Sequence, residues 1–302
     1  TSCVSDGHLT NPATDSRKYE STAESAIAGQ ATFNPVDRTA ESTDVQASAE
    51  DDLGERLDNP RGIAIDVDGN KYIVDSGDPT ASYGGRVVMI GRDEQLSTRF
   101  GSTVSAAFGE EYLLGLSDIA IDERGLFITT GTGAWVESPL YGPNQLLSLH
   151  DDGTVSQVFD AGVFEATFDP DNDGIDSNAT GLAIAHDGSF WVSDAAGNWV
   201  ANVSSSGDIL SLTTFSQVDG EDAVPTGIAV NQAGEVFVAL FNCPSAPDQS
   251  GGIARINANG TYDIVASGLS QPIDVVFDPA GRMLVLEFST NYLPNSGRLL
   301  AI

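Results

Sequence analysis

The sequence predicts an all-β protein, a β-propeller of five four-stranded blades with an extended polar N-terminal segment. Three features indicate this fold. Hydrophobic residues make up 40% of the 302 residues, which is enough for a globular core. The 32 glycine residues suit short strands joined by many turns. Finally, one strand–turn–strand plan recurs five times along the chain.

The recurring plan is an apolar strand, a turn that contains glycine, and a second apolar strand. Its five copies occupy residues 61–75, 117–130, 180–194, 226–240 and 273–287. With Gly62, Asp118, Gly181, Gly227 and Asp274 aligned, the intervals between successive copies are 56, 63, 46 and 47 residues. Periods near 40 to 50 with four short strands each are typical of propeller blades. One such sheet cannot bury both of its faces, whereas blades stacked round an axis bury each other's faces.

Each copy is followed by a third strand, as in residues 85–90, 144–149 and 252–256, and a polar turn then leads to a fourth, such as 262–266. The fifth copy ends at residues 297–302, which we expect to be its third strand. Its fourth strand must then come from elsewhere. The segment Ala31–Val36 is a candidate, because closure of the ring removes an exposed sheet edge. A sixth blade built partly from residues before Asn59 is the alternative, although no module is visible there.

Residues 1–56 differ from the propeller, which we place at residues 57–302. They hold 11 acidic and 4 basic residues, with few aromatic residues and many Ser, Thr and Ala. Such a composition does not provide its own core. We expect this segment to supply a closing strand, to wrap its own propeller, or to dock on a neighbouring subunit. The last alternative predicts a homo-oligomer or a protein partner held through the N-terminal segment.

The charge balance excludes some partners. With 44 acidic and 13 basic residues, the formal net charge is −31. A surface this negative repels nucleic acid and anionic lipid and attracts cations, so we expect no nucleic-acid partner. No apolar run approaches the roughly 18 residues that a membrane span needs. The two cysteines, Cys3 and Cys243, could form one long-range disulfide in an oxidising compartment.

The sharpest local motif is the acidic stretch from Asp169 to Asp176. Carboxylates at alternate positions followed by glycine let a tight loop fold oxygen atoms round Ca²⁺. The ligands predicted from this pattern are the side chains of Asp169, Asp171 and Asp173, the carbonyl of Ile175, and Asp176. The loop departs from the EF-hand pattern because Thr180 stands where that pattern has Glu. The alternative interpretation is an acidic turn that faces solvent.

A second candidate is a ring of acidic groups at the mouth of the propeller, where such folds often bind ligands. Residues six positions after the turn glycines include Asp75, Asp194 and Glu287, and Asp118 and Asp274 share a register at the first strands. These five positions form a candidate axial ligand site. However, an Asp after a strand often only accepts backbone N–H bonds in a turn, and we favour that interpretation.

Several longer motifs resemble a known family. They are residues 58–63, 176–182, 192–198, 223–230, 265–274 and 284–288. In combination they resemble the ScyD/ScyE family of secreted propeller proteins over roughly four fifths of the chain. The resemblance implies an exported propeller, located outside the cell or in the periplasm, whose biochemistry is largely unknown. Residues 1–56 lie outside it.

A broader likeness is to NHL-repeat and gluconolactonase-type propellers. That likeness implies a divalent cation on the axis, held by one Glu, two Asn and one Asp. Here the first strands offer Arg61, Asp118, Thr180, Thr226 and Asp274 instead, without the Asn pair. We therefore expect a non-catalytic, calcium-stabilised propeller that binds partners or copies of itself. The alternative is a metal-dependent, lactonase-like or hydrolase-like enzyme with an axial site.

Overall fold

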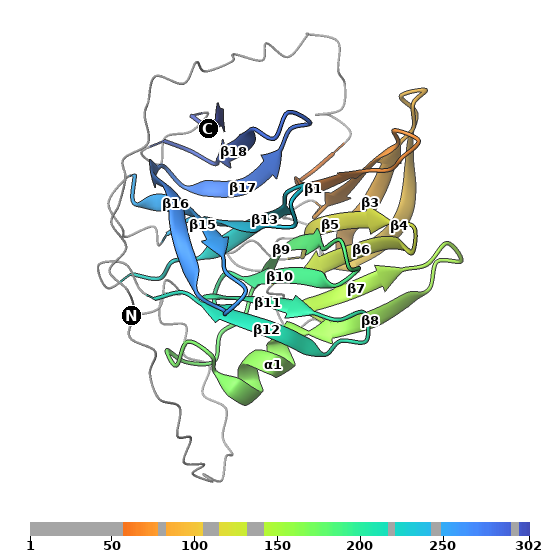
Figure 1. Ribbon diagram of the computed structural model, residues 1–302. Coiled ribbons are helices and arrows are strands. Elements are labelled where there is room, and N and C mark those ends of the chain that lie inside the picture. Colours follow the sequence, from red (N-terminus) through yellow and green to blue (C-terminus); the bar gives the residue numbers. More distant parts are fainter. Residues whose placement is uncertain are drawn as a thin grey trace.

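The computed structural model describes residues 57–77, 83–104, 115–131, 142–216, 221–242, 249–290 and 296–302. These residues form five antiparallel sheets, one for each predicted module, arranged as the blades of a five-bladed β-propeller (Figure 1). Within this part of the chain, no helix is long and apolar enough to cross a membrane.

The blades follow one another along the chain. Blade one contains β1 (Pro60–Ile65), β2 (Lys71–Asp75), β3 (Tyr83–Ile90) and β4 (Leu96–Val104). Blade two contains β5 (Leu116–Asp122), β6 (Gly125–Thr130), β7 (Gln145–Leu149) and β8 (Val155–Asp160). Blade three contains β9 (Ala179–Ile184), β10 (Phe190–Asp194), β11 (Trp199–Val203) and β12 (Ile209–Thr214). Blade four contains β13 (Pro225–Val230), β14 (Val236–Leu240), β15 (Gly251–Ile256) and β16 (Tyr262–Leu269). Blade five contains β17 (Pro272–Phe277), β18 (Met283–Glu287) and β19 (Arg298–Ala301).

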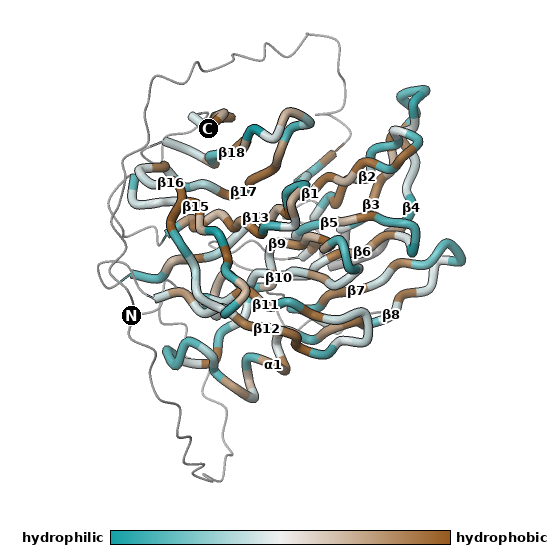
Figure 2. The backbone as a smooth tube through the Cα atoms, in the orientation of Figure 1, coloured by the Kyte–Doolittle hydropathy of each residue, from teal (hydrophilic) through white to brown (hydrophobic). Residues whose placement is uncertain are grey.

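A tight hairpin joins the first two strands of each blade, and a glycine ends the turn. Gly69, Gly188 and Gly281 have φ of 82°, 83° and 81°, a left-handed conformation that L side chains rarely adopt. This requirement explains why a glycine recurs at the same place in every module. Figure 2 shows the resulting pattern, with hydrophobic segments along the strands and hydrophilic segments at the turns.

The core lies between the blades rather than within any one of them. Four clusters of buried side chains join blade one to two, two to three, three to four, and four to five. The cluster between blades two and three contains the fully buried Trp199 and Phe190. Each blade therefore depends on its neighbour for burial of its apolar faces, as the repeat predicts.

Hydroxyl groups add polar links between successive blades. Ser76 of blade one donates to the carbonyl of Leu116 at the start of blade two. Thr129 of blade two donates to the carbonyl of Thr180 in blade three over 3.1 Å. The next two links run from Ser193 to Thr226 and from Thr226 to Pro272. These bonds hold the innermost strands in contact round the axis.

The predicted fold class is confirmed: five modules give five blades. The proposed fourth strand of blade five, Ala31–Val36, and the whole segment 1–56 lie outside the described residues. One element was not anticipated, the short helix α1 (Ala161–Phe168) in the connection between blades two and three. It positions the site described next.

Candidate metal centre

Helix α1 begins and ends at aspartate residues. The Asp160 carboxylate accepts the backbone N–H of Val163 over 2.8 Å, which satisfies a free donor of the first turn. The helix ends at Asp169, whose φ of 41° is left-handed and whose N–H donates to the Glu165 carbonyl. The chain therefore turns sharply after about two turns of helix and enters the acidic loop.

This turn brings three carboxylates together. One oxygen from each of Glu165, Asp169 and Asp171 lies within 4.8 Å of the others. Glu165 and Asp169 are four residues apart, so they lie on the same face of the helix and its cap. Asp171 completes the group from the loop that folds back. We call these residues the acidic triad.

Glu165 is the buried member of the triad. Its side chain is 0% exposed, and its Oε2 accepts the indole N–H of Trp199 over 2.8 Å. Its Oε1 is also buried but has no hydrogen-bond partner among the described residues. Burial raises the pKa of Glu165 to about 7, and the charges of Asp194, Asp171 and Asp169 act in the same direction. A buried carboxylate oxygen without a partner is costly, so this atom calls for a proton or a cation.

The two aspartates are half-buried and held by the loop itself. Asp171 accepts the amide of Asn198 over 3.1 Å and the N–H of Asp173 over 3.1 Å. Asp169 accepts the N–H of Gly174 over 3.3 Å. Burial raises the pKa of Asp171, and the charges of Asp169 and Asp173 add to this effect. These contacts fix the direction of both side chains without neutralising them.

No basic side chain is available to neutralise the triad from nearby sequence. Residues 125–254 contain 17 acidic residues and neither lysine nor arginine. This stretch includes α1, the acidic loop and all of blade three. Burial is the largest cause of the raised pKa of Glu165 and of Asp171, and neighbouring carboxylates raise both further.

The donor set is suited to a hard divalent cation. Three carboxylates supply only oxygen, the ligand type that Ca²⁺ and Mg²⁺ prefer, whereas zinc sites favour His and Cys. The C-terminal end of α1 adds backbone carbonyls without intrahelical partners and the negative end of the helix dipole. The residues therefore fit a metal ion held by oxygen ligands.

The predicted calcium ligands do not all lie at the same place in the structure. Asp169 and Asp171 join the triad, whereas Asp173 and Ile175 are exposed, Ile175 to 69%. Asp176 is half-buried, and burial raises its pKa, with Asp171 and Asp222 adding to the effect. Glu165 was missed because its helix is short and carries no clear amphipathic pattern. The long stretch without basic residues was the available signal.

Three of the five predicted mouth residues, Asp75, Asp194 and Glu287, are buried, and each accepts backbone N–H groups at the entrance to the first strand of its own blade. Asp75 accepts from Asn59 over 2.7 Å, and Asp194 accepts from Asn178 over 2.7 Å and from Gly197 over 2.9 Å. Glu287 accepts from Ser270 over 2.6 Å. Asp75 and Glu287 are also paired with Arg86 and Arg298.

The other two, Asp118 and Asp274, lie on the first strands of blades two and five. Asp118 Oδ2 accepts the N–H of Leu182 in blade three over 2.9 Å. A Cβ on Gly62 would lie 2.2 Å from Asp118 Oδ1, so only glycine permits this approach. Burial, then the charge of Asp274, raises the pKa of Asp118, and burial also raises the pKa of Asp274. The pair therefore tends to retain a proton.

The predicted disulfide cannot be placed, because Cys3 and Cys243 lie outside the described residues.

Comparisons with known proteins support the β-propeller fold. No family model matches the chain, and no curated protein matches it. Among solved structures, the chain is similar to virginiamycin B lyase from Staphylococcus aureus, with TM-score 0.50, 14% identity, and coverage of 81% of this chain and 69% of that one. It is also similar to a protein of unknown function from Bacteroides caccae, with TM-score 0.51, 13% identity, and coverage of 80% and 77%. At these identities the likeness supports the β-propeller fold alone.

Proposed function

We propose that this protein is an exported, non-catalytic β-propeller that binds protein partners and is stabilised by Ca²⁺ at the acidic triad. The observation that carries the proposal is the buried Oε1 of Glu165, which has no protein partner among the described residues, in a side chain whose carboxylate groups with those of Asp169 and Asp171. A bound cation would satisfy this atom and offset the repulsion among the three charges.

Calcium is favoured over magnesium by the irregular arrangement of the donors. Ca²⁺ accepts six to eight oxygen ligands in flexible geometry, whereas Mg²⁺ demands a near-ideal octahedron. The triad provides three carboxylates, and loop carbonyls and water would supply the rest. A calcium site in the weak range of extracellular modules, with Kd of about 0.1 to 1 mM, agrees with export. The resemblance to the ScyD/ScyE family supports the same localisation.

The partner surface that we propose is the helix and loop that the ion would order. Val163 and Phe168 on α1 are 62% and 66% exposed, and Ile175 in the loop is 69% exposed. Large apolar side chains exposed on one ordered segment are typical of a protein interface when they form one patch. Self-assembly is the related form of this proposal, with a second copy as the partner.

The site can be tested by terbium luminescence, because Tb³⁺ replaces Ca²⁺ at oxygen sites and is excited by a nearby indole. The indole of Trp199 donates directly to Glu165, so bound terbium should show strong tryptophan-sensitised emission. We expect Ca²⁺ to displace this signal. Glu165→Gln and Asp171→Asn should each weaken terbium binding by tenfold or more.

The matched control is Asp263→Asn, which removes an exposed carboxylate that is paired with Arg255 in blade four. It should bind terbium as the wild type does. Trp199→Phe should lose the sensitised emission but keep calcium binding in calorimetry. Equal binding by wild type and Glu165→Gln would contradict the proposal. Light scattering with and without chelator then tests whether the ion controls self-assembly.

A second candidate function is supported by Asp118 and Asp274, the half-buried pair on the axis. Two interacting carboxylates with raised pKa values are a common acid–base arrangement in metal-dependent or hydrolytic enzymes. Under this alternative, Asp118→Asn and Asp274→Asn would abolish turnover of a small lactone or ester substrate without loss of folding. A screen of such substrates that detects no turnover by the wild type would leave the pair with a structural role.

A further inference from the structure

The arginines of the propeller fall into two groups. Residues 57–302 contain eight arginines, and the structure describes all of them. Arg61 and Arg92 form no ion pair or hydrogen bond with the described residues, although the chain has 44 acidic residues. The other six are paired with Asp or Glu side chains: Arg86, Arg99, Arg124, Arg255, Arg282 and Arg298.

The two arginines without a partner differ in burial. Arg92 is exposed in the turn between β3 and β4, so water solvates its guanidinium group. Arg61 on β1 is half-buried, and its Nε is buried without a hydrogen-bond partner among the described residues. Burial lowers the pKa of Arg61, yet an arginine keeps its charge in proteins. A buried charged donor without an acceptor is costly, so Arg61 calls for an anion.

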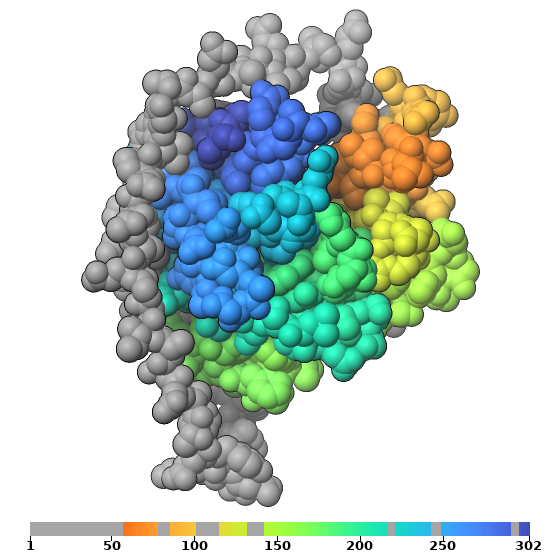
Figure 3. Space-filling model, in the orientation of Figure 1, coloured from red at the N-terminus to blue at the C-terminus, as the bar shows by residue number. Residues whose placement is uncertain are grey.

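Arg61 occupies a position that recurs on the innermost strand of every blade. In Figure 3 its blade, in orange, lies between blade five in blue and blade two in yellow and green. At this position Thr180 and Thr226 are held in place, because their hydroxyls donate to carbonyls of the next blade over 3.2 and 3.3 Å. The matching carbonyl for Arg61 is that of Leu116, which already accepts the hydroxyl of Ser76. The donors of Arg61 therefore remain free for a ligand.

The neighbouring carboxylate of blade two does not serve Arg61. Gly62 follows Arg61 on β1, and a Cβ at Gly62 would lie 2.2 Å from Asp118 Oδ1. The Asp118 carboxylate instead accepts the backbone N–H groups of Ile119 and Leu182, over 2.8 and 2.9 Å. A carboxylate thus comes close to β1 but is committed to backbone donors. The missing partner of Arg61 must come from outside the described residues.

The charge of the protein restricts which anion fits. The planar fork of a guanidinium group matches the two oxygens of a carboxylate or of a phosphate. A formal net charge of −31 repels every anion, and it repels a dianion such as a phosphate monoester more strongly than a monoanion. A single carboxylate therefore provides the required acceptors at the lower electrostatic cost.

We infer that Arg61 is the centre of a binding site for a small organic monocarboxylate on the innermost strand of blade one. The guanidinium group donates to both carboxylate oxygens, with the buried Nε–H as one of the donors. This inference does not depend on calcium, on the acidic triad, or on any catalysis by Asp118 and Asp274.

Nuclear magnetic resonance of the arginine Nε–H groups tests the inference on the full-length, ¹⁵N-labelled protein. Acetate, lactate or benzoate replaces chloride at constant ionic strength, and the Arg61 signal is the one that Arg61→Lys lacks. We expect at least one of these carboxylates to shift the Arg61 signal until it saturates, while the Arg92 signal stays in place. Inorganic phosphate should have a smaller effect. A stationary Arg61 signal, or equal shifts at Arg61 and Arg92, would overturn the inference.

Thermal unfolding provides a second test, which does not rely on assignment of the signal. The carboxylate that binds should raise the unfolding temperature of the wild type, because a ligand of the folded state stabilises it. The matched control Arg92→Lys should show the same rise, and Arg61→Lys should lose it, since lysine keeps the charge but lacks the planar fork. An equal rise in all three proteins would mean that carboxylates act as general salts. A larger rise with phosphate would contradict the proposed ligand class.

Discussion

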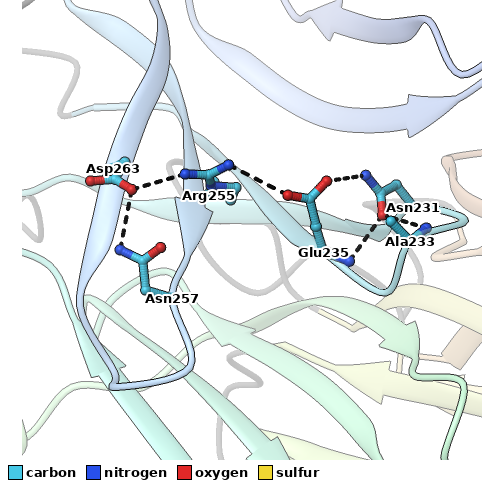
Figure 4. Close-up of polar contacts among 6 residues, drawn as sticks. All are labelled: Asn231, Ala233, Glu235, Arg255, Asn257 and Asp263. Atoms are coloured by element: carbon cyan, nitrogen blue, oxygen red, sulfur yellow. Dashed lines mark hydrogen bonds and ion pairs between the residues drawn. The ribbon is translucent and has the colours of Figure 1, made fainter.

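The acidic side chains of blade four and those of the acidic triad are stabilised in opposite ways. In blade four, Arg255 lies between Glu235 and Asp263, with N–O distances of 3.4 and 3.2 Å, and Asn231 and Asn257 donate to the same carboxylates (Figure 4). At the end of α1, three carboxylates converge with no basic residue in the surrounding sequence.

The difference teaches where an external cation is needed. In blade four the side chains of Arg255, Glu235 and Asp263 are 39% to 56% exposed, so water and one arginine are enough to stabilise the two carboxylates. Glu165 is fully buried, and water does not stabilise its second oxygen. The sequence around the triad contains neither lysine nor arginine, so the cation that we propose for the triad would have to come from solution.

The largest expected effect is that of calcium on stability. At a free concentration a hundred times its Kd, calcium should raise the free energy of unfolding by about 2.7 kcal/mol. Glu165→Gln should remove this gain, and Asp263→Asn should keep it. Urea unfolding at fixed ionic strength, with calcium or with chelator, measures the difference. An equal gain in all three proteins would show that calcium only screens the acidic surface.

The next effect concerns the bond between Trp199 and Glu165. Trp199 is fully buried and packs edge-on against Phe159 and Phe164, so Trp199→Phe alone removes both packing and the hydrogen bond. A double-mutant cycle with Glu165→Met separates the two. We expect a coupling energy of about 1.5 to 3 kcal/mol, the range for a bond to a charged group. A coupling energy near zero in chemical unfolding would mean that Glu165 is held by packing alone.

A pH-dependent effect is expected from the axial pair. Burial raises the pKa of Asp118 in the folded state, so between its unfolded and folded pKa values the folded protein binds more protons. Stability from this group is therefore present at low pH and is lost as the pH rises, by about 1.4 kcal/mol for each unit of difference. Asp118→Asn should flatten the dependence of unfolding free energy on pH between 5 and 8. Asp68→Asn, at an exposed turn, should leave the slope unchanged.

The sequence was informative where one requirement repeats. The turn glycines and alternating strands recur in five modules, so their pattern predicted the blades. The triad does not repeat. Asp169 and Asp171 could be found from their spacing, but Glu165 joins them only because an eight-residue helix ends at a left-handed aspartate. That geometry depends on packing of α1 against blade three, which no local pattern records.

The smallest effect should come from the blade-four network. Arg255→Ala removes both ion pairs, but its partners remain in contact with water and with Asn231 and Asn257. Exposed pairs of this kind contribute about 0 to 1 kcal/mol, and salt screens them. We expect Arg255→Ala to destabilise the protein by less than about 1 kcal/mol at low salt and by less still at high salt. A loss as large as that caused by calcium removal would mean that exposed acidic groups also depend on specific cations, and the contrast between the two regions would fail.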